Sequence, residues 1–332
     1  MLNLESGATL AVIPTGTGAG TNTPGIRRAD ELCFGSGVVL VANADPLDNF
    51  ITFIDSTTYG VIQRIRFDGT DPNGLNILAN GIEQCIFNPR DGKFYLNIPN
   101  TGPVTVPPTP LPGVTVRISG SAPFKVEKII ADFSKAPWNT TGCTGGTGIA
   151  LGPNPQLALS CGLIISDQDG SIIANFPSEG NADEMWFSHT TNHYFLAVST
   201  CKQTVTTTAC LGIIDAGPPP SADTVAGTAP GSHSVAADSL TNQVYVPIRG
   251  NAEVAPPGPF GTTCSKGKDV FGLAGSDALG CIAIYTAQSD SDDVVAGNGN
   301  GNGNGNGEGK GKGKGKGKGN GNGNGEDDGN DN

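Results

Sequence analysis

The chain has 332 residues, of which 50 are glycine and 24 are proline, against 13 phenylalanine, five tyrosine and two tryptophan. This composition, with short runs of Val, Ile and Leu between turn residues, favours many short strands over long helices. The formal net charge is -12, which argues against binding to the phosphate backbone of nucleic acids. No run approaches the roughly 20 apolar residues of a membrane-spanning helix, so we expect no membrane insertion.

The chain opens with two strand-like runs around the turn Glu5-Ser6-Gly7. Five later segments share one pattern: a short strand, a tight turn rich in Asn, Asp, Pro, Ser or Gly, and a second strand. This pattern predicts a β-hairpin each time. The segments are ADELCFGSGVVLVANA from residue 29, IEQCIFNPRDGKFYLNI from 82, GIALGPNPQLALSC from 148, ADEMWFSHTTNHYFLAV from 182 and SHSVAADSLTNQVYVPI from 232.

Another pair of strand-like runs follows most of these hairpins, for example residues 50–67 and 162–177. Two successive hairpins make a four-stranded antiparallel sheet of about 40 to 50 residues, the size of one propeller blade. The predicted fold is therefore an all-β propeller of four-stranded antiparallel blades. The last blade ends at residues 280–286 with three strands, so we expect five or six blades. Either the N-terminal runs supply the missing strand, or the chain lacks part of a larger ring.

Four segments carry a family resemblance. PTGTGAGTNTPGIRRADELCF, FITFIDSTTYGVI, GIALGPN and GSHSVAADSLTNQVYVPI resemble the YVTN-type β-propeller repeat proteins, which are often secreted or periplasmic. The resemblance covers nearly all of residues 1–290 and implies a seven-bladed relative. It implies no activity, because such propellers include binding scaffolds, cofactor-carrying proteins and enzymes. Since the chain begins with a strand and shows no signal-peptide pattern, we expect an N-terminally truncated ring.

The end of the chain differs in composition from the rest. From about residue 297 it alternates Gly with Asn or Lys and has no apolar side chain with which to form a core. We therefore expect a propeller over residues 1–290 and a disordered tail over 291–332. The five Lys of the tail balance its five acids, so the net negative charge belongs to the propeller.

Two columns of residues recur when the five hairpins are aligned on the end of their first strands. In a propeller these strands line the central channel, so equivalent positions form a ring at one depth. The first column is Asp30, Glu83, Gly148, Asp183 and His233. The second is Glu31, Gln84, Ile149, Glu184 and Ser234.

Because neighbouring strand residues point to opposite faces, only one column should aim at the channel axis, although this alternation loosens near a strand's start. We favour the first column as the convergent set, with Glu31 and Glu184 as competing candidates. The predicted metal ligands are Asp30, Glu83, Asp183 and His233. Oxygen ligands suit a divalent cation such as calcium, and a His among carboxylates also admits zinc or manganese.

A structural reading of the same acids remains open. Acids at blade entrances often cap backbone N–H groups or pair with an arginine, here Arg27, Arg28 or Arg249, and polar channels commonly hold only water. His189 and His193 fall in the turn of the fourth hairpin, where we expect a solvated role.

Two classes of function follow. The first is a monomeric binding scaffold that contacts a protein or small-molecule ligand. The second resembles metal-dependent lactonases, in which Glu31 or Glu184 would be the general base. The sequence contains no GxSxG, HExxH, Walker A or CxxC motif, so neither class gains support from a short catalytic signature.

Eight cysteines suggest disulfides. Three pairs are close in sequence: Cys143 with Cys161, Cys201 with Cys210, and Cys264 with Cys281. Cys33 and Cys85 occupy near-equivalent places in successive blades, so a bridge between blades is geometrically conceivable. Zinc binding is the rival interpretation, but the spacings match no zinc finger or ribbon. Disulfides predict an oxidising, extracellular location.

Overall fold

The computed structural model describes residues 1–15, 28–44, 48–103, 111–199, 209–223, 225–228, 232–248 and 281–286. The chain divides into two compact units, Met1–Ser289 and Asp290–Asn332. The second unit lies outside the described residues, so the predicted tail stays a prediction.

The described residues of the first unit form five antiparallel sheets and two short 3-10 helices, η1 (Pro72–Gly74) and η2 (Trp138–Thr140). In the described ranges there is no α-helix, and no helix long and apolar enough to cross a membrane. The strands are β1 (Arg28–Gly35), β2 (Val38–Ala44), β3 (Phe50–Asp55), β4 (Val61–Arg66), β5 (Cys85–Asn88), β6 (Lys93–Thr101), β7 (Leu111–Ile118), β8 (Val126–Asp132), β9 (Ile149–Leu151), β10 (Gln156–Leu159), β11 (Leu163–Ser166), β12 (Ile172–Asn175), β13 (Ala182–Ser188), β14 (His193–Val198), β15 (Cys210–Asp215), β16 (Ser221–Ala222), β17 (Ala226–Gly227), β18 (Ala236–Asp238), β19 (Gln243–Ile248) and β20 (Cys281–Thr286).

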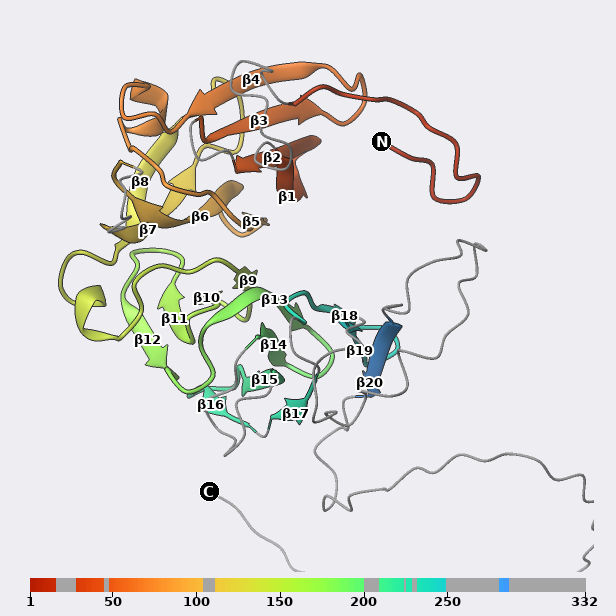
Figure 1. The fold of residues 1–332 in the computed structure, drawn as a ribbon, viewed down its shortest axis with the longest axis vertical. Helices are drawn as coiled ribbons and strands as arrows, with labels where there is room; N and C mark the ends of the chain where they lie inside the picture. The colour runs from red at the N-terminus through yellow and green to blue at the C-terminus, as the bar shows by residue number, and fades with distance from the viewer. Residues whose placement is uncertain are drawn as a thin grey trace, which may run out of the picture. The chain divides into compact units, whose positions relative to one another are not determined.

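Each sheet is a meander of consecutive strands and forms one blade of a β-propeller. Blades 1, 2 and 3 are β1–β4, β5–β8 and β9–β12. In blade 4 the outer strand is broken, so that β16 and β17 both pair with β15. Blade 5 has the three strands β18, β19 and β20 within the described residues. Figure 1 shows the blades following one another with β1, β5, β9, β13 and β18 on the inner side. The predicted all-β propeller is confirmed.

The buried apolar side chains lie between neighbouring blades, in four clusters that each join two successive blades. Between blades 1 and 2, Phe53 stacks on Phe124 with ring centroids 3.8 Å apart and meets Phe94 edge-on at 6.2 Å. Between blades 4 and 5, Phe195 and Val246 belong to one cluster. Burying one such side chain contributes about 1.5 to 3 kcal/mol, so the stability of each blade depends on its neighbours.

The N-terminal residues form a small hairpin outside the blades. Leu2 pairs with Thr9 across a single bridge, and the terminal ammonium of Met1 donates to the carbonyl of Ala11 at 2.8 Å. The side chain of Leu4 is exposed. This hairpin joins none of the five sheets in the described part of the chain, and it supplies no strand to blade 5 there.

Two disulfides are present among the described cysteines. Cys143, in the segment that connects blades 2 and 3, is bonded to Cys161, in the turn between β10 and β11 of blade 3, and Cys33 of β1 is bonded to Cys85 of β5. The second bond confirms that the near-equivalent positions in successive blades meet. Both bonds indicate an oxidising compartment. The pairings of Cys201 with Cys210 and of Cys264 with Cys281 depend on residues outside the described ranges and stay predictions.

Candidate functional site

The repeated Ala-Asp-Glu motif forms a β-bulge at the start of two inner strands. In β1, Ala29 pairs with Asn43 and Leu32 pairs with Val41, so three steps along β1 match two along β2. The same shift occurs in β13, between Ala182 and Met185. A bulge places two residues opposite one and re-aims their side chains. The strict alternation of a regular strand therefore does not apply to the Asp and Glu of either motif.

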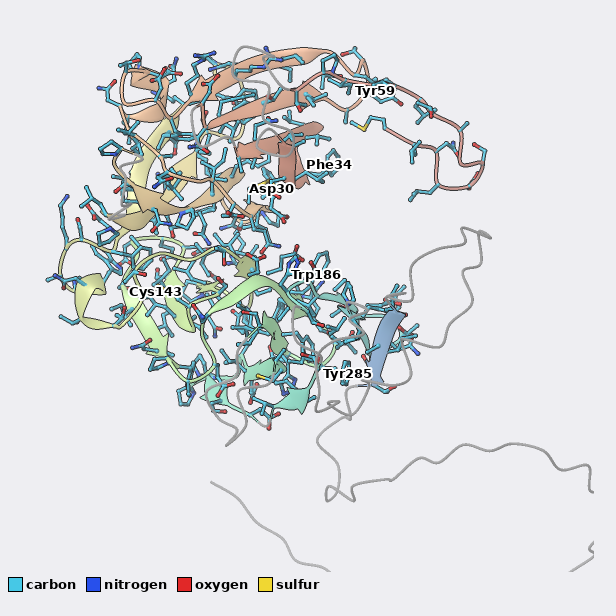
Figure 2. The ribbon with its side chains drawn as sticks, in the orientation of Figure 1. Asp30, Phe34, Tyr59, Cys143, Trp186 and Tyr285 are labelled. Atoms are coloured by element: carbon cyan, nitrogen blue, oxygen red, sulfur yellow. A yellow bond between two sulfur atoms is a disulfide. The ribbon has the colours of Figure 1, made fainter. Side chains whose placement is uncertain are left out.

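The two bulges bring Glu31 and Glu184, from blades 1 and 4, together. The carboxyl groups of these two residues lie close enough to interact, and the repulsion between two carboxylates favours the state in which one of them carries a proton. Burial, the negative charge of Glu184 and that of Asp30 raise the pKa of Glu31 to about 7, and Asp183 adds a smaller effect in the same direction. Figure 2 shows Asp30 and Trp186 on the inner side of blades 1 and 4, where these strands run. We call Glu31 and Glu184 the carboxyl pair.

Blade 5 holds Glu184 in place. The hydroxyl of Ser234 donates to Glu184 Oε1 at 3.0 Å, and the backbone N–H of Glu184 donates to the carbonyl of His233 at 3.2 Å. These two bonds fix both the strand and the side chain, so the carboxyl pair is pre-organised by three blades.

Blades 2 and 3 complete the same layer through the amide of Gln84. Its Oε1 accepts from the backbone N–H of Ile149 at 2.8 Å, and its Nε2 lies 3.5 Å from the carbonyl of Met185. Gly148 permits β9 and β13 to approach, because a Cβ there would lie 2.9 Å from the backbone of Asp183 and of Met185. The second column of the alignment is thus the layer in which all five blades meet.

The first column is placed differently. Asp183 Oδ2 lies 3.0 Å from His233 Nδ1, with both side chains about half exposed. The charges of Asp30 and Asp183 reach Glu31. In the ranges that the structure describes, no three His, Cys, Asp or Glu side chains form a group with metal-binding geometry. The predicted metal set of Asp30, Glu83, Asp183 and His233 stays a prediction.

The two histidines of the fourth hairpin behave differently from each other. His189 is exposed and its ring meets that of Phe187 edge-on at 4.9 Å. His193 is the first residue of β14 and is buried, with Nδ1 hydrogen-bonded to the carbonyl of Thr191 and Nε2 3.5 Å from Asp223. The expectation of a solvated His193 is therefore wrong, because the strand begins one residue earlier than the turn pattern suggests.

Comparisons with known proteins bear on the fold alone. No family model matches the chain, and no curated protein matches it. Among solved structures, the chain is similar to hydrazine synthase of Kuenenia stuttgartiensis, with 12% identity, a TM-score of 0.46 and coverage of 73% of this chain and 60% of that one. It is also similar to the β-propeller domain of Cps50 (Swd1) of Myceliophteria thermophila, with 9% identity, a TM-score of 0.43 and coverage of 65% of both chains.

A third similar structure is XC5397 of Xanthomonas campestris, described as a gluconolactonase, with 13% identity, a TM-score of 0.38 and coverage of 63% of this chain and 64% of that one. The chain spans less than two thirds of the length of each of these three proteins. At this level of similarity their activities do not carry over. The YVTN-type resemblance also stays a prediction.

Proposed function

We propose that this chain is an extracellular binding propeller that takes a cationic ligand at the carboxyl pair. The observation that carries the proposal is the proximity of the two carboxyl groups, where burial and acidic neighbours raise the pKa of Glu31 to about 7. The charges that raise the pKa of Glu31, those of Glu184, Asp30 and Asp183, are all negative. A bound cation offsets that repulsion and replaces the shared proton.

Calcium is the first probe, because carboxylate oxygens are its preferred ligands, and zinc and manganese come next. Glu31 and Glu184 would hold the ion, and the charges of Asp30 and Asp183 reach the same place. Because no three acids of the described residues already form a metal-binding group, these side chains would have to move closer together around the ion. Binding would release the proton that the pair shares, so calcium affinity should rise as the pH increases through about 7. Isothermal titration calorimetry at pH 6 and pH 8, in two buffers of different ionisation enthalpy, measures both the affinity and the proton release.

The matched control for this titration is Glu179→Gln. Glu179 is buried beside Ser178, and burial raises the pKa of its carboxyl as well, but it contributes nothing to the carboxyl pair. We expect Glu31→Gln to abolish calcium binding and Glu179→Gln to leave it unchanged. Calcium binding that survives in Glu31→Gln would remove the support for this site.

The same pair predicts a pH dependence of stability. Because the pKa of Glu31 is raised in the folded state, the folded protein binds more protons than the unfolded chain between about pH 4.5 and 7. Glu31 therefore stabilises the fold fully below pH 4.5, and this contribution is lost as the pH rises through 7. For a partly exposed carboxyl we expect a loss of roughly 1 to 2 kcal/mol.

Guanidinium denaturation of the wild type and of Glu31→Gln at several pH values isolates this contribution. The difference in unfolding free energy between the two proteins should change across pH 4.5 to 7 in favour of the variant at the higher pH. A difference that does not vary with pH would contradict the assignment. Acids that do not interact with Glu31, including Glu179, titrate equally in both proteins and cancel, so the difference reports Glu31 and its acidic neighbours.

A second candidate is a lactonase-like hydrolase, favoured by the pKa of Glu31 at about 7. A group with this pKa is well matched to general acid and base work at neutral pH. In this candidate Glu31 or Glu184 takes a proton from the water that attacks the ester carbonyl. Acid release from glucono-1,5-lactone in a pH-stat tests it: Glu31→Gln should lower the rate by about 10²-fold or more. A wild-type rate equal to that of buffer alone would eliminate this candidate.

A further inference from the structure

A cavity of about 600 Å³ lies at the outer part of blade 2, away from the carboxyl pair. It is formed where β6 begins, β7 ends and β8 begins, and the loop that contains η1, after blade 1, makes its other wall. Its lining residues are Pro72, Leu75, Lys93, Arg117, Lys125, Val126 and Glu127. We call this cavity the basic pocket. Its volume is that of a small-molecule site.

The pocket is cationic although the protein is acidic. Three basic side chains, Lys93, Arg117 and Lys125, face a single acid, Glu127. Glu127 is the extra residue of a bulge in β8, since Arg117 pairs with Lys128 and Ile118 pairs with Val126. In that position its Oε1 lies 2.6 Å from Lys93 Nζ and its Oε2 lies 3.1 Å from Arg117 Nε. One carboxylate thus holds two cations in place and leaves a surplus of positive charge.

The basic side chains keep unused hydrogen-bond donors. Arg117 engages Glu127 through Nε alone, and in the described part of the chain its two terminal nitrogens make no hydrogen bond. The ammonium of Lys125 likewise makes none there, and its side chain is exposed. A guanidinium that is fixed at one nitrogen and open at the others presents a planar fork suited to a carboxylate or phosphate.

The opposite wall of the pocket shows backbone strain. Leu75 has a φ of 54°, in the left-handed region that leucine seldom adopts, and its side chain is 43% exposed. Asp71 holds this loop in its conformation, because its carboxylate accepts hydrogen bonds from the backbone N–H groups of Arg66 and Asn73, both at 2.9 Å. Leu75 is the C-cap of η1, and its backbone N–H donates to the carbonyl of Pro72 at 3.2 Å. The left-handed conformation therefore ends the helix, and the side chain of Leu75 lies outside the core. Its apolar side chain lines the pocket, and a strained exposed residue of this kind is a reason to look for a ligand.

We propose that the basic pocket binds a small amphipathic oxyanion, with a carboxylate or phosphate on Arg117 and Lys125 and an apolar body against Leu75. The charge surplus and the open guanidinium fork select the anionic group. The exposed leucine and the neighbouring proline select the apolar part. This site is independent of the carboxyl pair and of any cation there.

The test uses the full chain, labelled at Leu methyl groups and at Arg Nε–Hε. Benzoate and phenyl phosphate are the probes, with benzyl alcohol and inorganic phosphate as controls that each lack one half of the ligand. We expect both probes to shift the Arg117 and Leu75 signals with saturation, at a Kd on the order of 1 mM for fragments of this size. Each control should bind at least about fivefold more weakly. Tighter binding of phenyl phosphate assigns a phosphate ligand, and tighter binding of benzoate assigns a carboxylate.

Three variants and one control variant test whether the pocket residues bind the probes. Arg117→Gln and Lys125→Gln should each weaken benzoate binding by about five- to tenfold. Leu75→Gly should weaken it similarly without lowering Tm, because glycine accepts the left-handed conformation that leucine resists. Lys128→Gln is the matched control, since Lys128 lies on the same strand but donates to the carbonyl of Gln168 instead. Unchanged affinity in Arg117→Gln, equal binding of benzyl alcohol, or shifts that never saturate would each overturn the proposal.

Discussion

Replacing Asp167 with alanine should lower the free energy of unfolding by about 3 to 5 kcal/mol. Asp167 lies after β11 in blade 3, is only 4% exposed, and its Oδ2 accepts hydrogen bonds from Asn88 Nδ2 at 2.7 Å and from Arg90 Nε at 2.9 Å. Asn88 is the last residue of β5 and Arg90 lies in the turn that follows it, both in blade 2. The substitution removes the buried carboxylate that pairs with the partly exposed guanidinium of Arg90. It also leaves the buried amide of Asn88 without its acceptor and breaks the polar contact between two blades.

Arg90 makes further hydrogen bonds to backbone carbonyls of blade 3, and these bonds do not replace the negative charge that Asp167 provides. Arg90 Nη1 donates to the carbonyl of Gly152 at 2.8 Å, which fixes the guanidinium beside blade 3 after its carboxylate partner is gone. The control is Lys135→Ala, which breaks the exposed pair of Lys135 with Asp132 and should change the unfolding free energy by less than about 0.5 kcal/mol. Guanidinium denaturation at pH 7 with equal m-values measures both. A loss below 1 kcal/mol in Asp167→Ala would show that this link is not a structural one.

Replacing Met185 with alanine should lower the free energy of unfolding by about 2 to 5 kcal/mol, whereas Leu32→Ala should cost less than about 0.5 kcal/mol. The two residues are equivalent in the repeat, since each is the first paired residue after the bulge of its inner strand. Met185 is 1% exposed, in the cluster between blades 3 and 4, and Leu32 is 65% exposed. Truncating Met185 leaves a cavity, and truncating Leu32 does not.

Met185 and Leu32 differ in burial because their blades have different neighbours in the ring. Equivalent residues in the other blades, Cys85 and Val235, are buried against the preceding blade, and among the described residues no blade precedes blade 1. The paired variants therefore test the repeat alignment and the interblade core together. Similar losses in both variants would mean that Leu32 is covered in solution, and equally small losses would mean that the core between blades 3 and 4 is loose.

The blade register could be predicted from the sequence because the hairpin pattern repeats. Aligning the strand ends placed Cys33 near the equivalent of Cys85, and these two residues are bonded. The exact number of strands in the last blade and the role of the N-terminal hairpin were not fixed by the pattern. Leu2 and Leu4 alternate like a strand yet remain exposed, since alternation alone does not say which edge a strand pairs with.

The site could be predicted only in part. The sequence identified both columns, and the first was preferred as the convergent set although strand alternation loosens near a strand's start. The bulges at Asp30–Glu31 and Asp183–Glu184 change the direction of these side chains, and no residue type in the motif signals a bulge. The basic pocket had no sequence signal either, because Leu75 of the loop after blade 1 and Arg117 of blade 2 are far apart in the sequence and meet only in the folded chain.

The direct measurement of the central claim is the titration of the Glu31 side-chain carboxyl by ¹³C NMR, assigned with Glu31→Gln and Glu184→Gln. The carboxyl pair predicts an apparent pKa near 7 for the second proton of the pair in the wild type. In Glu184→Gln the remaining carboxyl of Glu31 should titrate at a lower pH, because the repulsion from Glu184 is gone. A wild-type signal that titrates near the ordinary value of about 4.3, unchanged in Glu184→Gln, would contradict the claim that the two bulges bring these carboxyls together.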